Sequence, residues 1–85
     1  MDVITFYTKP NCHLCEDGLW ILEVALSNRD IPVHIVDIST DKALTERYGQ
    51  RIPVLKHPPY SIELDWPFTP ESILAWLEES DRAGQ

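Results

Sequence analysis

The stretch TFYTKPNCHLCEDG, residues 5–18, decides the fold because it joins a strand pattern to a helix pattern at the two cysteines of the chain. The β-branched and aromatic residues 3–7 predict a strand of about 3–8, and Lys9-Pro10-Asn11 is typical of a loop. A helix is then expected from near Asn11 to about residue 27. Its main apolar residues recur at helical spacing and are Leu14, Leu19, Leu22 and Leu26. The apolar face is widened by Trp20, Ile21, Val24 and Ala25. We therefore expect a strand, a corner and a helix that is packed on more than one side.

The rest of the chain continues this alternation of strands and helices. The pattern indicates, in order, a strand at 33–38, a short helix between the N-cap candidates 39–41 and Gly49, strands at 52–55 and 60–64 around a proline turn at 56–59, and a helix opened by Thr69-Pro70-Glu71. Because a parallel crossover is right-handed, the order β-α-β-α-β-β-α predicts an α/β fold. We expect one domain, residues 1–85, with a four-stranded mixed sheet and three helices on its two faces. Proline is rare inside a central strand, yet we place 52–55, which contains Pro53, at the centre.

The charge balance argues against several classes of partner. The chain has 14 acidic and 7 basic residues, a formal charge of −7, and no run of lysine or arginine. Such a surface repels phosphate backbones and anionic lipid headgroups, so neither nucleic acid nor membrane is an expected partner. The first residues resemble no secretory signal, and the apolar runs are far shorter than a bilayer span. We expect a cytoplasmic protein, in which two nearby cysteines are more often catalytic or metal-binding than structural.

The spacing of Cys12 and Cys15 favours a redox pair. With Asn11 as N-cap and Cys12 as the first helical residue, both sulfurs lie on the first turn, where side chains three apart are about 5–6 Å from each other at Cβ. A disulfide is therefore within reach, and the helix start stabilises a thiolate at Cys12. Lys9 adds positive charge on the same side, whereas the acids at 16 and 17 oppose it. We expect Cys12 to attack a disulfide and the more shielded Cys15 to resolve the intermediate.

Other interpretations of the cysteine pair stay open. A protonated His13 would favour the thiolate and make the pair more oxidising. The thiolates are also suitable ligands for a zinc ion or an iron–sulfur cluster shared between chains, and the pair is compatible with buried inert thiols or a redox-inert interaction module. Zinc within one chain would need about four ligands, and His34 and His57 are the remaining histidines. We interpret His34 as exposed or satisfied by a neighbour and His57 as a turn residue, and we expect no metal.

Three tryptophans complete the set of residues of interest. Trp20 and Trp76 occur at helical spacing and are expected in the core. Trp66 belongs to the loop Asp65-Trp66-Pro67-Phe68, where a large aromatic residue is either a core plug or one wall of a binding groove.

Two segments resemble the glutaredoxin-like members of the thioredoxin-fold superfamily. Residues 6–15, FYTKPNCHLC, are similar to the glutaredoxin signature with its tyrosine, lysine and C-x-x-C pair, and residues 48–54, YGQRIPV, are similar to the segment that holds its cis-proline. The resemblance implies that Cys12 is the nucleophile, that Cys15 resolves, and that Lys9 contacts the thiolate or a glutathione carboxylate. It further implies a substrate or glutathione groove that contains Tyr7, Gln50, Arg51, Ile52, Pro53 and Trp66, with a cis bond before Pro53 and the Ile52 backbone facing the substrate.

The resemblance implies a thiol–disulfide oxidoreductase with no bound cofactor, acting as a monomer on protein or low-molecular-weight disulfides. Its electrons would come from glutathione or from a thioredoxin-type reductase. Glutaredoxins usually have two glycines and an aspartate before the last helix, as part of the glutathione site, whereas this chain has residues 64–69, LDWPFT. This departure argues against glutathione binding. The segment around Trp66 is similar to that of a group of small, mostly bacterial glutaredoxin-like proteins.

Overall fold

The computed structural model describes residues 3–57 and 62–83. Its elements are β1 (Ile4–Thr8), α1 (His13–Ala25), β2 (Val33–Asp37), the 3-10 turn η1 (Ile38–Thr40), α2 (Lys42–Tyr48), β3 (Val54–His57), β4 (Ile62–Asp65) and α3 (Pro70–Ala83). The expected order of strands and helices is confirmed, with η1 added between β2 and α2. Of the expected hairpin, positions 58–61 lie outside the described residues.

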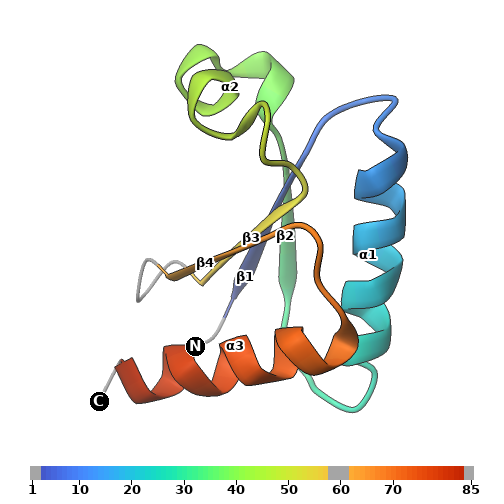
Figure 1. Cartoon of the computed structure of the whole chain (residues 1–85), viewed down its shortest axis with the longest axis vertical. Coiled ribbons are helices and arrows are strands. Elements are labelled where there is room, and N and C mark those ends of the chain that lie inside the picture. Colours follow the sequence, from blue (N-terminus) through green and yellow to red (C-terminus); the bar gives the residue numbers. More distant parts are fainter. Residues whose placement is uncertain (1–2, 58–61, 84–85) are drawn as a thin grey trace.

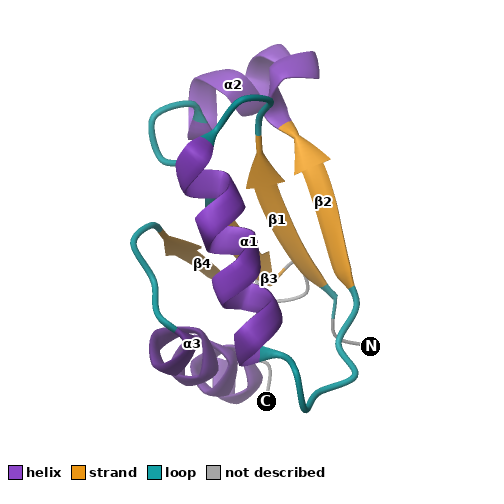
Figure 2. Ribbon diagram, turned by 90° about the vertical axis from the view of Figure 1, so that its right-hand side faces the viewer, coloured by secondary structure: helices purple, strands orange, loops and turns teal. Residues whose placement is uncertain are grey.

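The four strands form one mixed sheet in the order β2-β1-β3-β4. β1 pairs parallel to β2, and it pairs antiparallel to β3, which in turn pairs antiparallel to β4. Figure 1 shows α1 and α2 on opposite sides of the sheet, and in Figure 2 α1 and α3 lie together in front of it. The predicted α/β fold with helices on both faces is therefore confirmed. Because α1 directly follows β1 in the crossover, both cysteines lie just after the end of β1.

The core lies mainly between the sheet and the stripe of α1 that contains Cys15, Gly18 and Leu22. Trp76 of α3 is buried, as expected, but Trp20 is 67% exposed, so its placement in the core was wrong. Each residue advances about 100° around a helix, and Trp20 is two residues from both Gly18 and Leu22. It therefore lies about 160° around the helix from the buried stripe, on the exposed side of α1, which packs against α3 as well as the core. Leu14 and Val24 are exposed as well.

Several boundaries differ from those predicted. β3 starts at Val54, so Pro53 precedes the strand and occupies no place in its ladder, which explains how the strand after it can be central. His57, expected in a turn, is the last residue of β3 and is fully buried. His34 is exposed on β2, as expected. At the start of α3, the Thr69 hydroxyl accepts a hydrogen bond from the Ser72 amide at 3.1 Å, which confirms Thr69 as the cap.

Candidate active site

The two cysteines stand at the corner between β1 and α1 and are joined by a disulfide, with their Cα atoms 5.2 Å apart. The expected cap was wrong by one residue. Asn11 adopts a left-handed backbone conformation with φ of 59°, which asparagine tolerates better than most residues, and it turns the chain into the helix. Cys12 is the N-cap of α1, and its Sγ accepts a hydrogen bond from the Cys15 amide at 3.2 Å.

The two sulfurs differ in their access to solvent. Cys12 is half-buried at the tip of the corner, whereas Cys15 is only 3% exposed, one turn further along α1. An external disulfide can therefore approach Cys12 far more easily than Cys15. His13 between them points into solvent, with its side chain 98% exposed and its Nδ1 3.7 Å from Glu16 Oε2. A charge on a side chain this exposed is screened by solvent.

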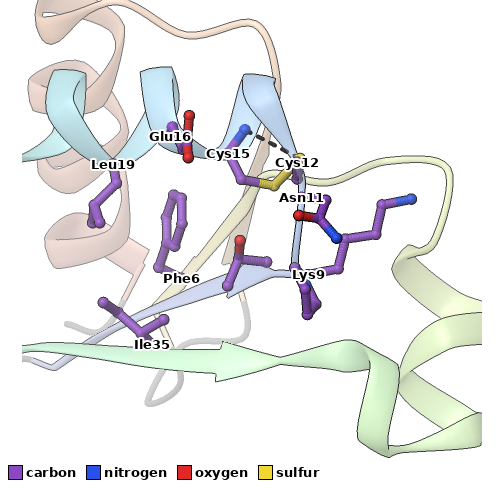
Figure 3. A pocket seen from close by; sticks show the side chains of 10 residues that line it. Phe6, Lys9, Asn11, Cys12, Cys15, Glu16, Leu19 and Ile35 are labelled. Carbon is purple, nitrogen blue, oxygen red and sulfur yellow. Dashed lines mark hydrogen bonds between the residues drawn. A yellow bond between two sulfur atoms is a disulfide. The ribbon is translucent and has the colours of Figure 1, made fainter.

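A pocket of about 250 Å³ opens beside the disulfide. It lies between β1, β2 and the first two turns of α1, and its lining is Phe6, Thr8, Lys9, Pro10, Asn11, Cys12, Cys15, Glu16, Leu19 and Ile35. In Figure 3 the side chains of Leu19 and Ile35 point toward each other across the pocket, with the Phe6 ring beside them and the disulfide at one end. Lys9, expected next to the cysteines, belongs to this pocket.

The Pro53 segment packs directly against α1. The Ile52–Pro53 bond is cis, as the resemblance implied, and Trp66–Pro67 is a second cis bond that was not expected. A Cβ atom on Gly18 would lie 2.9 Å from Pro53 Cγ and 3.3 Å from Phe68 Cζ, so only glycine leaves room for this approach. Gly18 was missed in the sequence analysis, although a glycine inside a helical pattern is a known sign of close packing.

Arg51 is held by two carboxylates of β4. Its Nη2 donates to Glu63 Oε1 and to Asp65 Oδ1, each at 2.8 Å. Glu63 also accepts a hydrogen bond from the Tyr48 hydroxyl at 2.5 Å, and the Tyr48 ring stacks on Tyr7 with 4.3 Å between centroids. We call these five residues the arginine clamp. The alternation of acids at positions 63 and 65, which places both on one face of a strand, was the signal for it.

The clamp shifts the ionisation of its members. Burial of Glu63 favours the neutral acid, but the hydrogen bonds from Tyr48 and Arg51, with the charges of Arg51 and Arg47, outweigh it and lower the pKa of Glu63. For Tyr48, burial and the neighbouring Glu63 carboxylate raise the pKa of the phenol. Glu63 therefore stays ionised and Tyr48 neutral across the physiological range, which keeps the loop before β3 tied to β4.

The residues expected in a substrate groove do not gather at the pocket. Tyr7 and Ile52 are buried, Arg51 and Trp66 are half-buried, and Gln50 is exposed. With Pro53, none of these described residues lines the pocket beside the disulfide. Trp66 packs edge-on against Phe68, which is itself in contact range of Gly18, with 5.1 Å between the ring centroids. The pocket and the Pro53 segment thus contact α1 at different places.

The fold and this corner define the class of protein: a thioredoxin-fold domain with a C-x-x-C disulfide at the start of its first helix. The model of the glutaredoxin-like domain family (DUF836) matches residues 3–78. The chain belongs to this glutaredoxin-like family. No curated protein matches the sequence.

Solved structures agree with this assignment. Protein XcR50 from X. campestris, a structural genomics target, is 39% identical, with a TM-score of 0.80 over 89% of this chain and 96% of that chain. Protein Ne2328 from Nitrosomonas europaea is 26% identical, with a TM-score of 0.75 over 88% and 89%. Thioredoxin 1 from Thermosipho africanus, at 16% identity and a TM-score of 0.59 over 93% and 98%, shares the fold.

Neither a membrane-spanning helix nor a metal-binding cluster occurs among the described residues. No helix there is long and apolar enough to cross a membrane. The same part of the chain contains no group of three or more histidine, cysteine, aspartate or glutamate side chains arranged to hold a metal ion.

Proposed function

We propose that this protein is a dithiol–disulfide oxidoreductase in which Cys12 is the nucleophile and Cys15 is the resolving thiol. One observation carries the proposal: the pair forms a disulfide at the start of α1, with Cys12 accessible and Cys15 buried behind it. The Cys15 amide that donates to Cys12 Sγ, together with the helix start, would stabilise a thiolate at that atom. Lys9, in the lining of the same pocket, would add positive charge.

The reaction follows from these two positions. The reduced Cys12 thiolate attacks one sulfur of a substrate disulfide, which breaks the S–S bond, forms a mixed disulfide with Cys12 and releases the other half as a thiolate that takes a proton from water. Cys15, deprotonated in turn, attacks Cys12 Sγ and releases the second half as a thiol. Two electrons pass from the dithiol to the substrate, and the Cys12–Cys15 disulfide remains.

We infer that glutathione is a poor electron donor and that a thioredoxin-type reductase regenerates the dithiol. Arg51, which the resemblance places in the substrate or glutathione groove, is already paired with Glu63 and Asp65. An anionic tripeptide would have to displace these carboxylates, and the adjoining segment 64–69 lacks the glycines of the usual glutathione site. Both observations weaken the case for glutathione and leave the dithiol chemistry unaffected.

The test compares the wild type with Cys12→Ser and Cys15→Ser. A low-molecular-weight disulfide is supplied with either glutathione and its reductase or thioredoxin reductase, with NADPH consumption as the readout. We expect turnover by the wild type with thioredoxin reductase only, and none by Cys12→Ser. Cys15→Ser should accumulate a covalent mixed disulfide, seen as a mass increase by the substrate thiol. Turnover by Cys12→Ser would refute the assigned nucleophile, and turnover with glutathione would refute the inferred donor.

A further inference from the structure

The pocket beside the disulfide has an apolar floor that is partly exposed to solvent. Phe6 is buried under it, but Ile35 on the edge strand β2 is 52% exposed. Ile35 pairs in register with Phe6, so the two side chains share the face of the sheet that looks toward α1. Leu19, half-buried on α1, closes the space from the opposite side (Figure 3). Three apolar side chains from three elements thus surround an opening that ends at Cys12 and Cys15.

The size of the opening limits what it can bind. Pockets for drug-sized ligands have volumes of about 300–1,000 Å³, whereas this pocket measures about 250 Å³. It is large enough for one aliphatic or aromatic amino-acid side chain, and a drug-sized ligand would extend beyond it. Because the cysteines form one end of it, a side chain seated there would belong to a residue next to the sulfur that reacts with Cys12.

The charges at the rim favour a neutral side chain. Glu16 lines the pocket, whereas the Lys9 amine extends away from the space between Leu19 and Ile35 (Figure 3), and the chain as a whole carries an excess of acids. An acidic side chain would meet Glu16 and the net negative field of the protein. A basic side chain would lose its hydration over Phe6, Leu19 and Ile35. An apolar side chain avoids both penalties, and burial of its surface against Phe6, Leu19 and Ile35 is favourable.

We propose that this pocket selects substrates, and that the preferred substrate is a peptide or protein disulfide with an apolar residue directly beside its reacting cysteine. The proposal rests on the function proposed above and adds the chemical class of the substrate. The substrate side chain occupies the space between Leu19 and Ile35 while its sulfur meets Cys12. The pocket thereby orients the scissile S–S bond and contributes to specificity before any covalent step.

The test uses symmetric disulfides of short blocked peptides in which leucine, glycine or aspartate stands on both sides of the cysteine. The protein is reduced with dithiothreitol, freed of it, and mixed with each peptide, and its oxidation in a single turnover is followed by mass spectrometry. Each rate is divided by that of dithiothreitol with the same peptide, which removes intrinsic differences in reactivity. We expect the leucine peptide to react about 10-fold faster than the glycine peptide, and the aspartate peptide to be slowest.

Variants assign this preference to the pocket. Ile35→Ala and Leu19→Ala should each reduce the leucine preference to about 3-fold or less. Val24→Ala is the matched control, because Val24 is similarly exposed but does not line the pocket. It should keep the full preference. Equal rates for all peptides with the wild type, or the same loss of preference in Val24→Ala, would overturn the proposal.

A binding measurement separates this proposal from the proposed function. Peptides with serine in place of cysteine are titrated into the oxidised protein, and methyl NMR signals of Ile35 and Leu19 are recorded. The leucine peptide should shift both signals at lower concentration than the glycine peptide does. If no peptide disulfide reacts but these shifts occur, the proposed function fails and the pocket stands; if peptides react but neither signal moves, the pocket proposal fails alone.

Discussion

Replacing Gly18 with alanine tests the contact on which the geometry of the site depends. The added Cβ atom would lie 2.9 Å from Pro53 Cγ and 3.3 Å from Phe68 Cζ. Carbon atoms in contact are normally about 3.5–4.0 Å apart, so one of the neighbours has to move by several tenths of an ångström. The Phe68 ring can shift within the core, but Cγ belongs to a closed proline ring on the backbone before β3. Relief therefore requires movement of α1 or of the Pro53 segment.

Two effects of opposite sign decide the stability of Gly18→Ala. Alanine is favoured over glycine inside a helix by about 1 kcal/mol, and overpacking of a filled core costs about 1–3 kcal/mol. Because the closest atom is in a ring that cannot rotate away, we expect the overpacking cost to be in the upper part of that range. The net free energy of unfolding should fall by about 1–2 kcal/mol, equivalent to about 4–8 °C in Tm for each kcal/mol in a domain of this size.

Urea unfolding of the oxidised protein, followed by far-UV circular dichroism, measures this change. Glu23→Ala is the control, since Glu23 is exposed on the same helix and both residues are good helix formers. It should stay within about 0.5 kcal/mol of the wild type. If Gly18→Ala is as stable as the wild type or more stable, the reasoning is refuted. The helix preference of alanine would then outweigh any cost of the close approach to Pro53.

Further substitutions test the other assignments. Glu63→Gln should lower the free energy of unfolding by about 1–2 kcal/mol at pH 7. Because the folded state lowers the pKa of Glu63, this stabilisation is present above the ordinary value of 4.5 and is lost as the pH falls below it; a gap from wild type that is constant in urea titrations at pH 7, 5 and 3 would contradict the clamp. His13→Ala should lower the reduction potential by about 10 mV in dithiothreitol redox buffers, since removal of a side chain that can carry positive charge disfavours the thiolate, and a higher potential would show that the charge argument is wrong. Trp20→Ala should change the free energy of unfolding by less than about 0.5 kcal/mol, and Trp76→Ala should lower it by about 3–5 kcal/mol; thermal denaturation with the opposite ranking would place the wrong tryptophan in the core.

Local patterns were sufficient for the element order and for the position of the cysteines. β-branched runs, loop residues and helix caps are properties of a few neighbouring residues, so they can be recognised without knowledge of the rest of the chain. The central position of β3 and the cis bond at Pro53 came from the resemblance, because no local pattern specifies which strands become neighbours. The N-cap of α1 was predicted at Asn11, whereas the structure has it at Cys12. An error of one residue is within the uncertainty of helix boundaries.

Features that depend on partners far along the chain were not predictable. α1 is apolar around most of its circumference, so periodicity alone does not say which side is covered, and Trp20 was assigned to the core for that reason. The partners of Arg51 are more than ten positions away on β4 and meet it only once the antiparallel pair β3–β4 has formed. The pocket beside the disulfide combines residues of β1, β2 and α1 in the same way.

The sulfur atom of Cys12 is both the cap of α1 and one half of the disulfide. A thiolate is a stronger hydrogen-bond acceptor than a disulfide sulfur, because charged acceptors form the shorter and stronger bonds. If reduced Cys12 is the thiolate of the proposed function, reduction of the pair strengthens the hydrogen bond from the Cys15 amide and so tightens the first turn of the helix. The exchange of the Cys15 amide proton with solvent becomes a built-in reporter of the redox state of the protein, readable without any attached label.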